Sequence, residues 1–371
     1  MTVTEEALKR MTPSKKPPSK RSDYLSSGST LLNLAISGTT LGLYLKGRYI
    51  YYVGDSMSGK TWLVLTALAE AVRNPSFSEY RLIYDDAEDG ALMKLEKFFG
   101  AEVVERLEPP SWDEDDEELH SATIEDFYDN ITDALTEAEK DGGRPFIYIL
   151  DSMDSLSSEA QDKKFEENKR KRSEGKAADQ KGSFGDGKAK KNSEHLRKVR
   201  SRVKATNSIL IIISQTRDDI NPRTFTTKTR SGGKALTFYA HVEIWTSTVA
   251  NEKKEFKVNK KEYKKAVKQT TRCRIKKNRI TGNTTDVDLT ILKNYGVDDI
   301  GDNVDFLVKY GHWEMKKQTI IADDFDFSGV RKRLIAHIEE NNLERMLQSL
   351  VRELWEELEE VARPKRKKRY G

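Results

Sequence analysis

Short, almost wholly apolar segments alternate with amphipathic segments between residues 48 and 213. The apolar segments predict strands at 48–53, 81–85, 146–150 and 208–213. The segments between them repeat apolar residues at helical spacing and predict helices at 60–73, 89–99, 123–140 and 193–205. Because near-continuous apolar strands that alternate with amphipathic helices are typical of a parallel sheet covered on both faces, we expect an α/β fold.

The pattern changes after residue 213. More mixed apolar segments predict additional strands, which we expect to be antiparallel, at 238–247, 268–275, 285–292 and 304–308. After about residue 322 the chain is predicted to be helical, and apolar residues recur at helical spacing over 343–361. We expect this apolar stripe to pack against its own domain, with a partner protein as the alternative.

Composition divides the chain into three expected parts: a flexible basic arm at 1–22, a core at 23–322, and a helical C-terminal region with a basic tail at 323–371. Within the core, residues 157–192 are almost wholly polar and predict a mobile, charged insertion. Charged residues make up 34% of the chain, so some charged segments must lie outside the apolar core.

Residues 54–61 follow the first of these predicted strands and open the helix predicted at 60–73. They read Gly54, Asp55, Ser56, Met57, Ser58, Gly59, Lys60 and Thr61, which matches the P-loop pattern G-x-x-x-x-G-K-[ST]. In a P-loop the glycines allow backbone N–H groups to face a phosphate at a helix N-terminus. Lys60 can then reach the β- and γ-phosphates, and the Thr61 hydroxyl can bind Mg²⁺. The alternative is a glycine-rich turn without a ligand, but the flanking strand and helix favour a nucleotide site.

Polar side chains follow three of the predicted parallel strands. Asp151 comes directly after the strand at 146–150, where a carboxylate can hold Mg²⁺ beside the P-loop. Glu88 lies just beyond the strand at 81–85 and could polarise an attacking water, although Asp85 and Asp86 are equally well placed by spacing alone. Gln215 follows the strand at 208–213 and could donate a hydrogen bond to a γ-phosphate.

The net charge is only +4, but the basic residues are clustered. Residues 163–204 contain 16 Lys and Arg against 6 Asp and Glu, and further basic stretches occupy 253–277 and 364–369. Such clusters are typical of proteins that bind a polyanion, with a solvated surface as the alternative. No apolar run is long enough to predict a membrane span, and the N-terminus lacks the pattern of a secretory signal. The single cysteine, Cys273, excludes an internal disulfide and is expected to be a small buried apolar residue.

Taken in order, these motifs resemble those of the RecA-type recombinases, including their phage relatives. The resemblance covers about residues 25–315, and its most specific part is the run Ser-Gly-Gly-Lys-Ala-Leu-Thr-Phe-Tyr-Ala at 231–240. The other matching segments are 25–35, the P-loop, 84–88, 150–152 and the basic strand at 272–280. The resemblance implies a RecA-like P-loop ATPase core, with a mostly parallel sheet, an antiparallel extension and a small helical C-terminal region.

The resemblance also assigns roles to individual residues. It makes Asp151 the Walker B acid, Glu88 rather than Asp86 the catalytic glutamate, and Gln215 the sensor of the γ-phosphate. Lys277 and Arg279 match a pair of cations that complete the ATP site from the neighbouring protomer. At the positions that contact adenine in the family this chain has Leu92 and Leu95, which leaves selectivity for adenine open.

Two DNA-binding loops follow from the same resemblance, the first at 157–192 and the second at 216–231. Their cations are expected to bind phosphates, and Phe225 could stack on bases or simply anchor its loop to the core. The expected DNA-binding residues are Lys188, Lys190, Lys191, Arg217, Arg223, Phe225, Lys228 and Arg230.

The resemblance therefore implies a DNA-dependent ATPase that uses ATP and Mg²⁺ and binds single-stranded DNA as a homo-oligomer, most simply a helical filament. It would promote homologous pairing in recombination and repair, in the cytoplasm of a bacterial or phage-infected cell, with mediator or single-strand-binding proteins as further partners. A hexameric helicase with the same core is an alternative. A protein that binds ATP without hydrolysing it is another, which the presence of Lys60, Glu88 and Asp151 disfavours.

Overall fold

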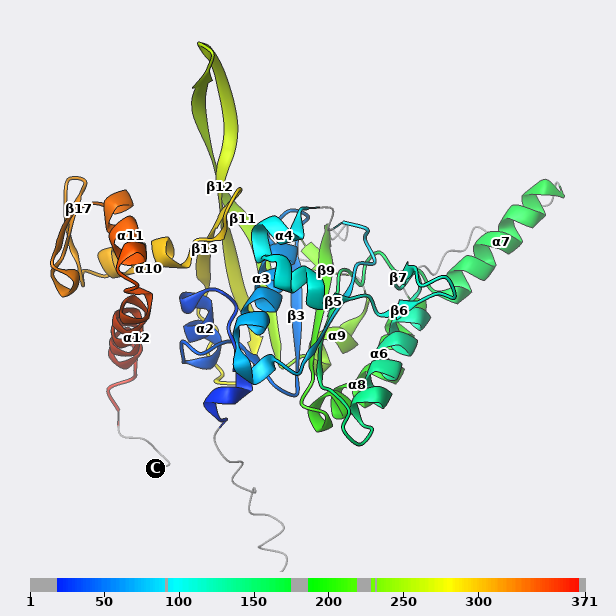
Figure 1. Cartoon of the computed structure of the whole chain (residues 1–371). Coiled ribbons are helices and arrows are strands. Elements are labelled where there is room, and N and C mark those ends of the chain that lie inside the picture. Colours follow the sequence, from blue (N-terminus) through cyan, green and yellow to red (C-terminus); the bar gives the residue numbers. More distant parts are fainter. Residues whose placement is uncertain (1–18, 91–92, 175–185, 219–227, 231, 367–371) are drawn as a thin grey trace, which may run out of the picture.

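The computed structural model describes residues 19–90, 93–174, 186–218, 228–230 and 232–366. A large central sheet runs through them in the order β14-β13-β12-β11-β3-β9-β8-β4-β5, and β10 pairs with β9 outside this path (Figure 1). Six of its strands are parallel to their neighbours: β3 (Arg48–Gly54), β4 (Arg81–Asp85), β5 (Leu107–Glu108), β8 (Phe146–Leu150), β9 (Ile209–Asp218) and β11 (Val242–Val258). The expected α/β fold with a mostly parallel sheet is confirmed.

The remaining strands of the sheet form the antiparallel extension. They are β10 (Lys228–Arg230), β12 (Lys261–Asn278), β13 (Val287–Leu292) and β14 (Gly296–Val297). Three short pairings lie apart from the central sheet. These are β1 (Tyr24–Leu25) with β2 (Tyr44–Leu45), β6 (Ser111–Trp112) with β7 (Glu118–Leu119), and β15 (Glu314–Lys316) with β16 (Thr319–Ala322) and β17 (Phe327–Val330).

Helices cover both faces of the central sheet, because successive strand side chains point to opposite sides. On one face, Ile50 and Tyr52 of β3 belong to an apolar cluster that includes α2 (Thr30–Ser37) and α3 (Lys60–Arg73). On the other face, Tyr49 and Tyr51 belong to a cluster with α6 (Ile124–Ala138), α8 (Asp186–Ala205) and α9 (Lys234–Tyr239). The shorter helical segments are η1 (Arg21–Asp23), η2 (Pro75–Phe77), α4 (Leu95–Phe99), α5 (Ala101–Arg106) and η3 (Asp323–Phe325).

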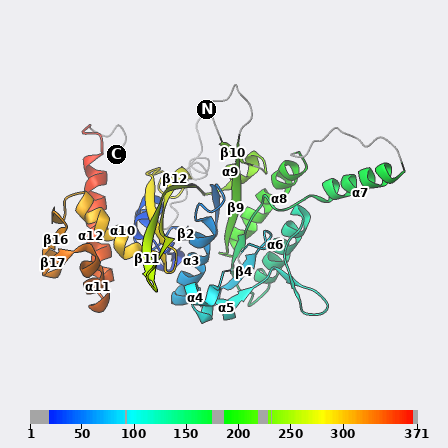
Figure 2. The same ribbon diagram turned by 90° about the horizontal axis from the view of Figure 1, so that it is seen from above.

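The C-terminal part contains α10 (Asp299–Lys309), α11 (Arg331–Glu340) and α12 (Glu344–Val361). It lies at the opposite end of the molecule from α7 (Glu159–Ser173), as Figure 2 shows. Leu347 and Leu354 of α12 are buried in the same apolar cluster as α2 and α3. The apolar stripe therefore packs against its own chain, as predicted.

Three predicted elements are wrong in type or extent. Of the helix expected at 89–99, the described residues form only α4, which begins at Leu95. Residues 304–308 form part of helix α10, not a strand: Val304, Phe306 and Leu307 are buried in one apolar cluster, and Asp298 caps the helix. The described part of the expected mobile insertion at 157–192 is largely helical: it contains α7 and the start of α8. Helix α7 begins with a capping box at Ser158, and such a signal does not depend on apolar residues.

The strands predicted at 238–247 and 268–275 belong to a much longer hairpin, β11 with β12, and α9 occupies the first residues of 238–247. Cys273 is buried in β12, as predicted, and burial raises the pKa of its thiol. Within the described part of the chain, none of the helices combines the length and apolarity that crossing a membrane would require.

Candidate active site

The P-loop joins the end of β3 to the start of α3, and a cavity of about 220 Å³ opens above it. Backbone geometry explains why glycine is required at two positions. A Cβ on Gly54 would clash with Thr246 Oγ1 in the adjacent strand β11, and Gly59 has φ +95, a left-handed conformation. The predicted strand–loop–helix context of a phosphate site is therefore present.

Lys60 lies at the first turn of α3 and is almost fully buried. Its Nζ donates to the carbonyl oxygens of Gly54, at 2.9 Å, and Asp55, at 2.8 Å. Burial lowers the pKa of Lys60, and the carboxylates of Asp151 and Glu88 oppose that shift. The ammonium group is thus held within the loop, among carboxylates, where an anionic ligand would add a further favourable partner.

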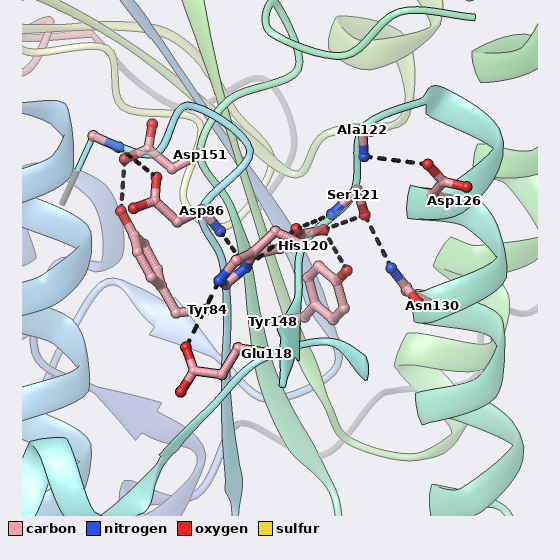
Figure 3. A network of polar contacts seen from close by, with 12 residues as sticks. Tyr84, Asp86, Glu118, His120, Ser121, Ala122, Asp126, Asn130, Tyr148 and Asp151 are labelled. Atoms are coloured by element: carbon pink, nitrogen blue, oxygen red, sulfur yellow. Dashed lines mark hydrogen bonds and ion pairs between the residues drawn. The ribbon is translucent and has the colours of Figure 1, made fainter. Parts of the chain in front are cut away.

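Thr61 and Asp151 meet as the sequence predicted. The Thr61 hydroxyl donates to Asp151 Oδ2 at 2.7 Å. The Tyr84 hydroxyl donates to the same oxygen at 3.1 Å (Figure 3). Asp151 follows β8 directly, and burial raises its pKa to about 6. A hydroxyl and a carboxylate at the carboxyl edge of the sheet form a hard oxygen donor set, which is the kind that Mg²⁺ prefers.

Glu88 and Gln215 are also brought together at the cavity. Gln215 Nε2 donates to Glu88 Oε1 at 2.8 Å, and the Ser152 hydroxyl donates to the same oxygen. Gln215 is itself positioned by Asp154, whose Oδ2 accepts from the Gln215 backbone N–H at 2.6 Å. Asp154 was not predicted from the sequence, although it follows β8 at the same edge as Asp151.

Asp85 is engaged elsewhere. Its buried carboxylate accepts from the backbone N–H and the hydroxyl of Ser121 and from the Tyr148 hydroxyl. Burial raises the pKa of Asp85, and these hydrogen bonds oppose the shift. Asp86 Oδ1 accepts from the Gly90 backbone N–H. Of the three carboxylates left open by spacing, Glu88 is the one that lines the cavity.

Two residues of the antiparallel extension also line the cavity and were not predicted. Gln269 of β12 donates from Nε2 to the Met57 carbonyl oxygen at 2.8 Å. Lys293, just after β13, donates from Nζ to Gln269 Oε1 at 2.7 Å. Gln269 is a buried polar residue in a strand, but its burial is known only from the structure, so the sequence carried no signal that singled it out.

Lys277 and Arg279 lie away from this cavity within the chain. Thr246 pairs with both Gly54 and Cys273, so Lys277 lies four residues, about 13 Å, further along β12 from the P-loop edge. Lys277 Nζ donates to the carbonyl oxygens of Thr237 and Phe238 at the end of α9. Burial and the nearby Arg279 lower the pKa of Lys277 to about 8.

The predicted second DNA-binding loop is a hairpin at its base. Strands β9 and β10 pair antiparallel, and Arg217, Lys228 and Arg230 lie on these strands, while Arg223 and Phe225 lie outside the described residues. The Thr216 hydroxyl, in β9, donates to the Asp55 carboxylate of the P-loop. A direct hydrogen bond therefore joins the phosphate loop to the base of this hairpin.

The three lysines expected to bind DNA from the first loop lie on α8. Lys188 is only 8% exposed and donates to the Asp154 carbonyl oxygen at 3.3 Å. It therefore supports the segment after β8 that positions Gln215, and it is not presented to solvent. Lys191 forms an ion pair with Glu125 at 3.3 Å. Lys190 is exposed and lies 3.9 Å from Glu194 on the next turn of the helix.

Comparisons with known proteins find similarity to RecA proteins. A family model described as the RecA N-terminal domain matches residues 169–298. A RecA protein of Chloroherpeton thalassium is 27% identical over 287 residues, which cover 77% of this chain and 68% of that protein. A RecA protein of Anaplasma marginale is 26% identical over 300 residues, covering 81% and 71% of the two chains. A crystal structure of the RadB recombinase has 16% identity and a TM-score of 0.47, and covers 74% of this chain and 98% of that one.

The fold and the site define a P-loop nucleotide-binding protein with a mostly parallel sheet. The chain is similar to these RecA proteins over most of its length, and the RecA N-terminal domain model matches part of it.

Proposed function

We propose that this protein is a DNA-dependent ATPase that binds single-stranded DNA as a helical homo-oligomer and promotes homologous pairing. The observation that carries the proposal is the pair of contacts that link the nucleotide cavity to the 216–231 hairpin. Thr216 bonds to Asp55 in the P-loop, and Gln215 bonds to Glu88 in the cavity wall. Both residues lie on β9, whose far end enters that hairpin.

The residues of the cavity fit ATP with Mg²⁺. The oxygens of Thr61 and Asp151 are 2.7 Å apart and would hold the metal, while Lys60 and the P-loop N–H groups would bind the phosphates. Bound there, ATP supplies the phosphoryl group that is transferred to water. Glu88 has its carboxylate fixed by Gln215 and Ser152 at the cavity, as a group that orients and polarises a water must be.

Gln215 provides a route from nucleotide to DNA. In the present arrangement its amide is satisfied by Glu88, and a phosphate oxygen in the cavity would compete for the same N–H group. A shift of Gln215 toward that oxygen would move the end of β9 and hence the base of the 216–231 hairpin. Nucleotide and DNA would therefore favour the same conformation.

The position of Lys277 and Arg279 supports a site that is completed between protomers. Neither Lys277 nor Arg279 lines the cavity above the P-loop of the same chain. We propose that they reach the ATP of a neighbouring protomer, which makes ATP a determinant of assembly.

The test is phosphate release with and without single-stranded DNA, for the wild type and for Gln215→Ala. We expect little turnover without DNA, a strong rise with it, and loss of most of that rise in Gln215→Ala with nucleotide binding retained. Lys60→Ala removes the phosphate contact itself and is the control in which nucleotide binding and turnover should both be lost. Turnover that is indifferent to DNA would refute the coupling. Electron micrographs with a non-hydrolysable nucleotide address the assembly, because closed rings instead of open helices would favour a helicase.

A further inference from the structure

The β11–β12 hairpin extends well beyond the central sheet. The pairing of β11 with β3 ends at Thr246, and the pairing of β12 with β13 ends at Lys268. Beyond these points the two strands pair only with each other, up to a turn in which Asn259 and Lys260 have φ 50 and φ 67. Positive φ at both positions is the type I′ turn that joins tightly twisted strands. Residues 249–266, here called the distal hairpin, project from the core in Figure 1.

The distal hairpin has no neighbouring strand among the described residues to stabilise it, and an isolated hairpin is at best marginally stable in water. Phe256 and Tyr263 lie opposite each other across the two strands, yet they remain 42% and 52% exposed. Val258, near the turn, is also exposed. These side chains offer apolar and aromatic surface at the point furthest from the core.

The register divides the distal hairpin into two unlike faces, because paired residues share a face and successive residues alternate. The first, here called the stacking face, carries Lys254, Phe256, Val258, Lys261, Tyr263 and Lys265. The second, here called the paired face, carries Lys253, Glu255, Lys257, Glu262, Lys264 and Ala266.

Each face has three lysines, but their electrostatic surroundings differ. On the paired face, Glu255 lies 3.1 Å from Lys264 and Glu262 lies 3.4 Å from Lys257, so cross-strand ion pairs neutralise most of the charge. On the stacking face, no acidic residue occurs among the six positions of the register, but Glu252, two residues before Lys254 on β11, lies 3.5 Å from Lys254. Three lysines against this one acidic partner, compared with three against two on the paired face, leave the larger net positive charge on the face that also bears both aromatic rings.

Lysines interleaved with exposed aromatic rings are the chemistry by which proteins bind single-stranded nucleic acid, with cations on phosphates and rings on bases. An acidic peptide would use the lysines but leave the two rings without a matching partner. We propose that the stacking face of the distal hairpin binds a nucleic acid strand, with Lys254, Lys261 and Lys265 on phosphates and with Phe256 and Tyr263 against bases.

The place of the hairpin in the fold supports this site. It leaves the sheet beyond Thr246, which pairs with Gly54, so it emerges from the same edge as the P-loop and the 216–231 hairpin. A cavity at the base of the distal hairpin offers no excess of positive charge for a phosphate, because its charged lining is mixed. It comprises the acidic Glu252, Asp298, Asp305 and Glu339 and the basic Lys254, Lys268 and Arg331. The contact is therefore assigned to residues 254–265, separate from both predicted DNA loops.

The faces supply a matched test. Two triple variants each remove three positive charges from this hairpin, one from each face. They are Lys254→Gln/Lys261→Gln/Lys265→Gln on the stacking face and Lys253→Gln/Lys257→Gln/Lys264→Gln on the paired face. Binding of a labelled oligothymidine is measured by fluorescence anisotropy without nucleotide, at several salt concentrations. We expect the stacking-face variant to bind at least about tenfold more weakly at low salt. Each phosphate contact to a single strand contributes about 0.7 to the salt slope, the slope of log K against log salt concentration. Loss of three contacts should therefore lower the slope by about 2.

The paired-face variant should lose less than about threefold. Phe256→Ala/Tyr263→Ala should weaken binding of the single strand about tenfold while leaving the salt slope unchanged, because stacking releases no counterions. Unchanged melting of each variant would show that the exposed substitutions leave the fold intact.

Three results would overturn the proposal: equal losses in the two lysine variants, retained affinity in the stacking-face variant, or face-dependent binding of polyglutamate in place of DNA. Weaker binding of duplex only, with the single strand unaffected, would also overturn it. Because these measurements use no ATP, they stand even if turnover proves independent of DNA, and the proposed ATPase stands even if the hairpin fails them.

Discussion

Replacing Gln269 should loosen the tip of the P-loop, which this residue supports from a distant strand. Gln269 is buried, donates to the Met57 carbonyl oxygen at 2.8 Å and accepts from Lys293 at 2.7 Å. Met57 has φ 60, a left-handed conformation that is unfavourable for a residue with a side chain. A loop held in such a conformation depends on contacts from outside itself.

The size of the effect follows from the two hydrogen bonds. A neutral bond contributes about 1 kcal/mol and one to a charged group about 1.5–3 kcal/mol. Gln269→Leu removes both, and rehydration of the exposed Met57 segment and of Lys293 returns part of the loss. We therefore expect a net cost of about 2 kcal/mol, or roughly 30-fold in the Kd for nucleotide, if the loop must be ordered to bind phosphate.

The assay is titration of a fluorescent ATP analogue at fixed Mg²⁺ without DNA, with a melting curve for each variant. Lys293→Gln is the comparison, because it keeps an N–H donor for Gln269 and removes only the charge. Unchanged nucleotide affinity in Gln269→Leu would refute the reasoning and show that the loop supports itself. Equal losses in Lys293→Gln and Gln269→Leu would instead identify the Lys293 cation as the important group.

Three further predictions concern pH and packing. Burial lowers the pKa of Lys277 to about 8, so ATP-dependent assembly measured by light scattering should weaken as the pH rises from 7 to 9, and Lys277→Arg should abolish that dependence. Burial lowers the pKa of His241 to about 4 where its Nδ1 accepts from the Tyr49 N–H, so the unfolded state binds more protons below about pH 6.5. Urea unfolding should show stability falling by on the order of 2 kcal/mol from pH 6.5 to 4, and His241→Gln should remove most of this loss. Leu347→Ala should lower the free energy of unfolding by about 2–5 kcal/mol, whereas the exposed Met346→Ala should cost well under 1 kcal/mol.

The sequence predicted the parallel half of the fold well because buried strands there are continuously apolar. Strand β4 begins and ends where expected, and helix α3 does too, since a P-loop fixes its first turn. Residues 304–308 were misjudged because a short apolar run fits a buried helical face as well as a strand. Helix α7 was missed because its capping and ion-pair signals are local and polar, with no buried residue to give apolar periodicity.

The site divides in the same way. Asp151 and Glu88 could be predicted because each follows a parallel strand, and Gln215 because it lies where the parallel pairing of β9 with β3 ends; parallel strands bring their carboxyl ends to one edge. Gln269 and Lys293 could not, because their approach to the cavity depends on the register of long-range antiparallel pairing. Nor could the burial of Lys188 be read from a run of lysines.

Strand β9 passes without interruption from the core, through Gln215, to its pairing with β10. A stiff connection of this kind couples the nucleotide cavity to the hairpin and the hairpin to the cavity equally. If ATP in the cavity raises the affinity of the hairpin for DNA by some factor, thermodynamic reciprocity requires DNA to raise the affinity for ATP by the same factor. DNA would then act as an effector of nucleotide retention, so that a protomer on DNA loses ATP by dissociation less readily than a protomer in solution.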